Sequence, residues 1–410
     1  MMKQLWTLSI FMLFTGIISA QTIDRCHQEQ WLEQMIEQDP NYQIKIEKGF
    51  ADFNSGKLKP THNRAFVTLP VHVIIVHPPG QPEGTGQNLS LEHVMSQIDV
   101  LNQDFGQYNS DSGNTPAQFP AGDTGIQFCL ATVDPDGNAT DGITRYPFSG
   151  NFDANASSIR SETRWPRDNY INIWVAPNLP YLGLASVPST GGLPPANNDF
   201  IHVTTGSFGG PGYATLAPYD LGRTTTHEMG HYLGLFHIWA SNGCSNDDGI
   251  SDTPVQDNEN FGCPSHPSPS CSNSGDMFMN YMDYVNDNCM NAFTVGQGNY
   301  MNTILSTSRA TLPGSSSFAC VEVVPLELTV LSQSDPLCAN ADNGTILVEA
   351  SGGTPNYSYS INGSAFSSNS LFTDLGPGTY VIEVVDADGN SDSVIVSLGS
   401  PNPLGAIIDI

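Results

Sequence analysis

Blocks of apolar and polar positions along the 410-residue chain predict an α+β domain followed by an all-β domain. Apolar runs typical of strands occupy residues 66–76, 125–131, 170–176 and 182–187. Helical periodicity predicts helices at residues 90–105, 224–234 and 294–309, the first capped by Ser90. The order of these elements predicts a sheet with helices above a cleft and irregular chain below it. The short run at 182–187 has the character of an edge strand, which can hold an extended peptide by backbone hydrogen bonds.

The N-terminal segment predicts export and processing. Lys3, a following apolar run and the small residues Ser19 and Ala20 are typical of a signal peptide at residues 1–20. Residues 21–64 predict a propeptide, with a helical stripe at 26–38 and an exposed, cleavable stretch at 54–64. The apolar run is too short for a transmembrane span, so we expect a secreted protein whose cysteines can be oxidised.

The C-terminal part changes character after the main globular domain, which we assign to residues 65–320. Pro, Gly and Ser within residues 312–324 predict a linker. Residues 325–400 predict a small all-β domain, with strands at 345–350, 357–361 and 379–385. The final residues, Gly-Ala-Ile-Ile-Asp-Ile, do not resemble the end of a natural domain, so we expect the protein to continue beyond residue 410.

The segment from His227 to His237 reads His-Glu-Met-Gly-His-Tyr-Leu-Gly-Leu-Phe-His, which matches H-E-x-x-H-x-x-G-x-x-H. His227 and His231 are four residues apart, so they lie on one face of a helix and can bind one zinc ion. Gly234 permits the turn that brings His237 back as third ligand, and the fourth position stays open for water. Glu228 stands beside this face as general base for the zinc-bound water. The pattern predicts peptide-bond hydrolysis and is typical of metzincin proteases.

The charge balance excludes one class of partner and suggests another. The chain has 13 Lys plus Arg against 41 Asp plus Glu, a net charge of −28. Such a chain offers no basic patch to neutralise phosphates, so we expect no nucleic-acid partner. Abundant carboxylates suit either simple solubility or calcium binding, and the composition leaves both open.

These motifs resemble the pappalysin family of metzincins over residues 24–320. The resemblance rests on Asp-Arg-Cys at 24–26, the strand pattern at 126–145, the zinc motif, and the cysteines that follow it. It implies a zinc protease fold with a Met-turn at Met282, below the zinc. The C-terminal domain resembles an SprB-type repeat through residues 351–360 and 376–380. Such a repeat implies association with the cell surface.

The resemblance also implies roles for single residues after the zinc motif. Tyr284 would stabilise the oxyanion, and Asp287 would lie in the pocket for the residue after the cleaved bond, favouring Arg or Lys there. Self-activation is then expected near Lys57, Lys59 or Arg64. The implied structural features are the disulfides Cys244–Cys271 and Cys263–Cys289, and a calcium site of Asp248, Ser251 and Thr253.

Several alternatives stay open. Cys26 is a latency switch that fills the open zinc position, a member of a disulfide in the mature chain, or an idle thiol. The four cysteines after the zinc motif either form the two disulfides or bind a second zinc. Cys129 and Cys320 are a further candidate pair, and Cys338 is unassigned. The leading function is a secreted zinc endopeptidase acting on proteins or peptides; the rival is a surface adhesion or carbohydrate-binding protein with an accessory or inactive protease domain.

Overall fold

The structure is a computed structural model, and it describes residues 24–59, 66–240, 243–319, 326–338, 341–352, 356–386 and 391–400. The chain divides into two compact units, Met1–Val321 and Glu322–Ile410. The predicted signal peptide, Arg64 and Cys320 lie outside the described residues. None of the helices in the described ranges combines the length and apolar character that crossing a bilayer requires.

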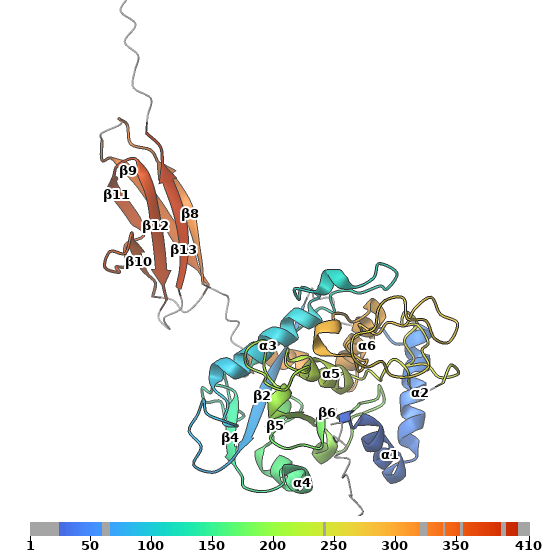
Figure 1. Cartoon of the computed structure of the whole chain (residues 1–410). Helices are drawn as coiled ribbons and strands as arrows, with labels where there is room; N and C mark the ends of the chain where they lie inside the picture. The colour runs from blue at the N-terminus through green and yellow to red at the C-terminus, as the bar shows by residue number, and fades with distance from the viewer. Residues whose placement is uncertain are drawn as a thin grey trace, which may run out of the picture. The chain divides into compact units, whose positions relative to one another are not determined.

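A seven-stranded sheet forms the centre of the first unit (Figure 1). Its strands are β1 (Asp24–Cys26), β2 (Val67–His77), β3 (Ile126–Leu130), β4 (Ile143–Pro147), β5 (Ile171–Ala176), β6 (Tyr181–Ala185) and β7 (Ile201–Thr204). The order is β1-β6-β7-β5-β2-β3, and β4 also pairs with the long β2. Neighbours run parallel except β6 and β7, which are antiparallel.

The two faces of the sheet bury separate cores because side chains alternate along β2. Val73 and Ile75 face the core under α3 (Leu91–Phe105) and α5 (Arg223–Tyr232), whereas Ile74 and Val76 face the core with α4 (Phe152–Thr163). Figure 1 shows α3 and α4 on opposite sides of the sheet. The chain before β2 adds α1 (Gln28–Gln38) and α2 (Asn41–Asn54). The predicted α+β architecture, a sheet with helices on both faces followed by irregular chain, is confirmed.

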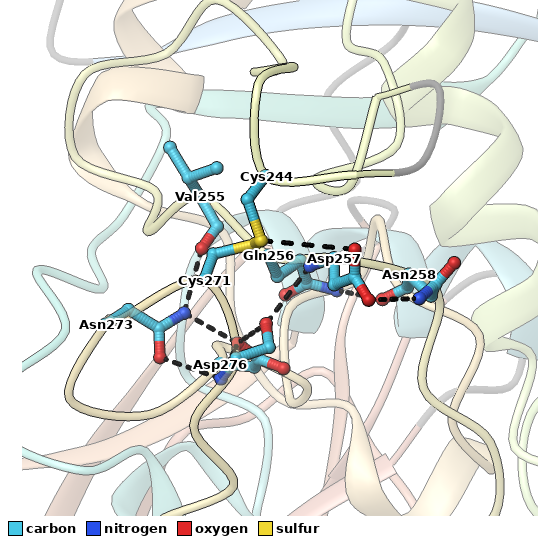
Figure 2. The surroundings of a disulfide bond; sticks show 9 residues. Cys244, Val255, Gln256, Asp257, Asn258, Cys271, Asn273 and Asp276 are labelled. Atoms are coloured by element: carbon cyan, nitrogen blue, oxygen red, sulfur yellow. Dashed lines mark hydrogen bonds between the residues drawn. A yellow bond between two sulfur atoms is a disulfide. The ribbon is translucent and has the colours of Figure 1, made fainter.

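The chain after α5 is irregular up to α6 (Val295–Ser306), and two disulfides cross-link it. They join Cys244 to Cys271 and Cys263 to Cys289, the pairs that the family resemblance implied, so the alternative of a zinc site made of these four cysteines is wrong. Figure 2 shows the first disulfide beside Asn273, whose side-chain amide donates to the Val255 carbonyl at 2.8 Å. Single-turn helices complete the unit at Ser112–Asn114, Ala196–Asn198, Thr205–Ser207 and Asp287–Cys289.

The prediction of a linker at residues 312–324 is wrong for its first part. Residues Leu312–Ala319 form helix α7. Leu312 is completely buried and Ser315 is nearly so. The Pro, Gly and Ser residues disfavour a helix in isolation, but packing of Leu312 in the core of the first unit overrides that local preference.

The second unit consists of two three-stranded sheets around one small core. Its strands are β8 (Glu327–Ser334), β9 (Gly344–Ser351), β10 (Ser358–Ile361), β11 (Leu371–Leu375), β12 (Gly378–Val385) and β13 (Ser391–Leu398). Strands β9, β10 and β12 coincide with the three predicted ones, whereas β8, β11 and β13 were not predicted. Ile346, Ile382 and Val384 are fully buried at its centre.

Candidate active site

Three imidazoles converge at the C-terminal end of α5. The Nε2 atoms of His227, His231 and His237 lie 3.1–3.2 Å from one another, and all three rings are buried. Helix α5 supplies the first two, and the turn at Gly234, with a φ of 101°, brings back the third. Tetrahedral zinc with bonds of about 2.0–2.1 Å would separate its nitrogen ligands by about 3.3 Å. The spacing therefore fits one zinc ion.

The hydrogen bonds behind the rings support the same conclusion. Nδ1 of His227 donates to the Tyr281 carbonyl at 2.7 Å, and Nδ1 of His231 donates to the Leu235 carbonyl at 2.8 Å. Nδ1 of His237 donates to Glu29 of helix α1 at 3.1 Å. Each Nε2 is therefore a bare lone pair, since neutral imidazole carries one proton. Three lone pairs so close repel one another unless a cation lies between them. Zinc would be held by these three residues.

Glu228 projects from α5 beside the histidines and is completely buried. Burial raises the pKa of its carboxyl well above the usual range. Strand β6 crosses directly over it at Gly183, where a Cβ atom would lie 2.7 Å from the carboxyl carbon of Glu228. Only glycine leaves room for this approach, so the strand and the carboxylate hold each other in place.

Met282 and Tyr284 lie on the turn below the histidines. Met282 is fully buried under α5, and a Cβ on Gly230 would lie 2.5 Å from its sulfur. The Tyr284 ring packs 4.9 Å from the His237 ring. Its hydroxyl donates to the main-chain carbonyl of Cys26 at 3.0 Å. The turn therefore supports the three imidazoles from below and directs one phenol hydroxyl toward the chain in the cleft.

That chain in the cleft is strand β1. It pairs in parallel with β6, with Asp24 opposite Tyr181 and Cys26 opposite Gly183. Without β1, β6 would be the edge of the sheet, as expected for residues 182–187. Cys26 is a buried free thiol that groups with the three histidines as a potential metal ligand, and its sulfur lies 3.6 Å from Glu228.

Arg25 pairs with the buried carboxylate of Asp287. Its Nη2 lies 3.4 Å from Asp287 Oδ1, and its Nη1 donates to the carbonyls of Tyr284 and Val285. The guanidinium carbon lies 4.7 Å from the centre of the Tyr219 ring. Both members of the ion pair are buried. Burial raises the pKa of Asp287, and the Arg25 charge opposes that rise. Arg25 therefore supplies the buried Asp287 carboxylate with a counter-charge.

The predicted calcium ligands are only partly together. Asp248 is buried, and its Oδ1 accepts from the Thr253 hydroxyl at 2.7 Å, whereas Ser251 is exposed in the adjoining turn. Burial raises the pKa of Asp248 well above its usual range, and the nearby Asp247 carboxylate adds to the rise. Asp252 instead accepts from the Gly296 amide in the first turn of α6.

Some contacts of the site have no signal in local sequence. Arg25 was noticed only as part of Asp-Arg-Cys, and Glu29 and Gly183 were not singled out at all. Each depends on a partner far away in the chain: Arg25 and Asp287 are 262 residues apart. Cys129 is in a disulfide, while its predicted partner Cys320 lies outside the described residues.

A buried His₃ cluster with an adjacent glutamate, an edge strand and a methionine turn defines a metallopeptidase. Residues 153–306 match the family model of M43 peptidases, described as pregnancy-associated plasma protein-A. An extracellular metalloprotease of Colletotrichum graminicola is 30% identical over 232 residues, which are 55% of this chain and 73% of the relative. One of Arthroderma otae is 33% identical over 219 residues, 52% of this chain and 70% of the relative.

Solved structures give the same result. A mutant of promirolysin from Tannerella forsythia is 35% identical, with a TM-score of 0.64 over 72% of this chain and 99% of that one. Mature mirolysin from the same organism, in complex with a cleaved peptide, is 37% identical, with a TM-score of 0.56 over 62% of this chain and 99% of that one. Residues 330–366 match the SprB repeat.

The chain belongs to the M43 (pappalysin) family of peptidases. It is an extracellular zinc metalloendopeptidase, and peptides are its substrates. The expected enzyme class and export are therefore confirmed. Residues 24–59 cover the site as the pro-segment of a zymogen does.

Proposed function

We propose that this peptidase cuts on the amino side of Arg or Lys, with Glu228 as general base. The observation that carries the proposal is Arg25, which places a guanidinium against Asp287 next to the zinc-binding histidines. Once the pro-segment leaves, Asp287 keeps only the backbone amides of Leu221 and Arg223 as partners of its Oδ2. The nearby Arg223 charge then remains as the partial compensation of this buried carboxylate. Because burying a carboxylate is costly, the site favours a substrate that brings a second cation.

The zinc ion, when bound, would polarise the scissile carbonyl and lower the pKa of water near it. Glu228 is placed to take the proton of the attacking water and to pass it to the leaving amine nitrogen. Its buried position supports this role, because burial favours the protonated carboxyl that the second transfer requires. The general-base assignment depends on Gly183, which lets β6 lie against the carboxylate.

Tyr284 is proposed as the donor that stabilises the negative charge developing on the scissile carbonyl oxygen. Its support is the 3.0 Å hydrogen bond to the Cys26 carbonyl, which stands in for a peptide carbonyl in the cleft. A phenol that already donates to a neutral carbonyl donates more strongly to an oxyanion. Met282 is proposed to act only as the support beneath α5.

Residues 21–64 are proposed to be the propeptide, and Cys26 its latency switch. The Cys26 thiol lies with the three imidazoles, where it would occupy the position that a water needs. The second unit, residues 325–400, is proposed to associate with the cell surface, on the basis of its SprB match.

Calcium is proposed as a second, structural metal near Asp248. Its Oδ2 is buried and makes no hydrogen bond within the described residues, and a second carboxylate, Asp247, is adjacent. A hard cation would satisfy this oxygen. Thr253 and the main chain at Ser251 are the other proposed ligands. Calcium should raise the melting temperature of the native chain and have little effect on the Asp248→Asn variant.

The preference is tested with paired peptides that differ only after the scissile bond, carrying Arg, Lys or Leu. The wild type should cleave the Arg and Lys peptides with a kcat/KM at least 100-fold above that of the Leu peptide, and Asp287→Asn should remove most of that ratio. Glu228→Ala should lose cleavage while keeping one zinc per chain, as measured by metal analysis. Equal cleavage of all three peptides by the wild type would refute the specificity, and activity in Glu228→Ala would refute the general base.

A further inference from the structure

A second set of pro-segment contacts lies on α2. Phe50 stacks on Tyr300 of α6, with ring centroids 4.4 Å apart and planes at 11°. Phe53 meets the same ring edge-on at 5.1 Å, and Phe236 lies 5.8 Å from Phe50. Tyr300 is only 1% exposed in this arrangement. Two pro-segment rings therefore cover an aromatic surface of the catalytic unit.

The rest of α2 also packs closely against the catalytic unit. The Tyr42 hydroxyl donates to the Val187 carbonyl, and the Asn54 side chain donates to the Gly249 carbonyl at 3.0 Å. At Gly49, a Cβ would lie 2.7 Å from the Thr190 hydroxyl oxygen. The helix thus contacts the catalytic unit from its first turn to its last.

The expected activation cuts all lie beyond these contacts. Helix α2 ends at Asn54, and the exposed Lys57 and Lys59 follow it. Cleavage before either lysine leaves β1, α1 and α2 whole, together with the Arg25 and Cys26 contacts in the cleft. The cut by itself therefore breaks none of the contacts described for residues 24–54.

We propose that residues 24–54 are a self-contained inhibitor that stays bound after the activating cut, anchored by the aromatic contacts of Phe50 and Phe53. The proposal rests on the proposed function, because it takes this segment to be the propeptide of a peptidase. Cleavage turns an intramolecular contact into a bimolecular one, so inhibition then depends on protein concentration. Activation has two stages, the cut and the release, and the released segment can bind the active site of another copy.

The binding arm of the test uses the full chain with Glu228→Ala, which is not expected to cut itself. This chain also carries Lys45→Arg and Lys48→Arg, because these α2 side chains are 46% and 66% exposed and could be cut as well. A lysine-specific endoprotease is added to cut after Lys57, where the side chain is 64% exposed, and mass spectrometry verifies the cut. The fragment is expected to co-elute with the catalytic unit in gel filtration at micromolar concentration. Phe50→Ala or Phe53→Ala should raise the concentration of half-dissociation roughly tenfold or more.

Ile44→Ala is the matched control, because Ile44 lies on the same helix but is 60% exposed. It should change the half-dissociation concentration less than twofold. Phe50→Leu keeps apolar bulk without the stacked ring and should fall between wild type and Phe50→Ala. Melting of the uncut variants verifies that each one folds. Equal effects of Phe50→Ala and Ile44→Ala would overturn the assigned anchor.

The activity arm follows cutting and peptide cleavage together in the wild-type chain. Activity should lag behind the cut at micromolar concentration, and dilution to nanomolar concentration should remove the lag. Immediate separation of the fragments at micromolar concentration, or activity that rises in step with the cut, would overturn the inhibitor. The binding arm needs no peptidase activity, so a wild-type chain that never cleaves peptides would contradict the proposed function instead.

Discussion

Gly183→Ala tests how the sheet positions Glu228. A Cβ at residue 183 would lie 2.5 Å from Cγ of Glu228 and closer still to its Oε1, whereas ordinary contact begins at 3.4 Å, so the carboxylate or the strand must move by about 0.9 Å. Since a misplacement of about 1 Å can cost on the order of 100-fold in rate, we expect kcat to fall roughly 30- to 100-fold. The overpacking should also lower the free energy of unfolding by about 1–3 kcal/mol.

The assay measures kcat and KM on a peptide with Arg after the scissile bond, alongside zinc content and melting temperature. Gly191→Ala is the matched control, because its nearest heavy atoms would lie at 3.7 Å and its φ is not positive. The control should stay within twofold of wild type. If Gly183→Ala retained more than half of the wild-type kcat with zinc bound, β6 would not be what positions Glu228.

Three other outcomes follow from the same contacts. Arg25→Ala removes the cation paired with the buried Asp287, while the Arg223 charge stays nearby, so the latent form should lose about 1–3 kcal/mol and self-activation should be faster. Arg25→Lys should keep most of the latency, and an unchanged lag in the activity trace would contradict this. Replacing Cys244 and Cys271 by Ser opens a loop with a sequence separation of 27 and should cost about 3–4 kcal/mol, seen as a lower melting temperature; an unchanged melting temperature would argue that the loop is held without the bond. Chelation should abolish cleavage and lower the melting temperature, and added zinc should restore both; cleavage that survives complete zinc removal would exclude the metal mechanism.

The zinc site could be predicted from sequence because its ligands are local. Helical spacing sets the distance between His227 and His231, and a single glycine turn returns His237. The same holds for the long strands and for α3, whose Ser90 cap accepts from the His93 amide as expected for such a residue. Each of these features depends on residues that are close to one another in the sequence.

The remaining features could not be predicted because they depend on distant partners. Whether Gly183 is an ordinary strand glycine or a point of close approach depends on α5, which follows it by dozens of residues. Helix α7 was mistaken for a linker because the burial of Leu312, not local propensity, stabilises it. Helix α2 was not predicted from the sequence. Its Phe50 packs on Tyr300, a residue of α6 that lies far away in the sequence, so no local pattern indicates this contact.

The way the pro-segment satisfies the site shows what a substrate must replace. Residues 24–26 give Asp287 a cation, Tyr284 a carbonyl acceptor and strand β6 a neighbour. When they leave, each of these groups loses its partner, and an unpaired buried group costs more than a typical hydrogen bond contributes. A peptide that restores only the strand pairing would leave the buried Asp287 with the Arg223 charge but without the cation that Arg25 supplied. Selectivity for a basic residue therefore comes chiefly from the penalty on other residues, so it should persist in substrates whose remaining sequence binds β6 equally well.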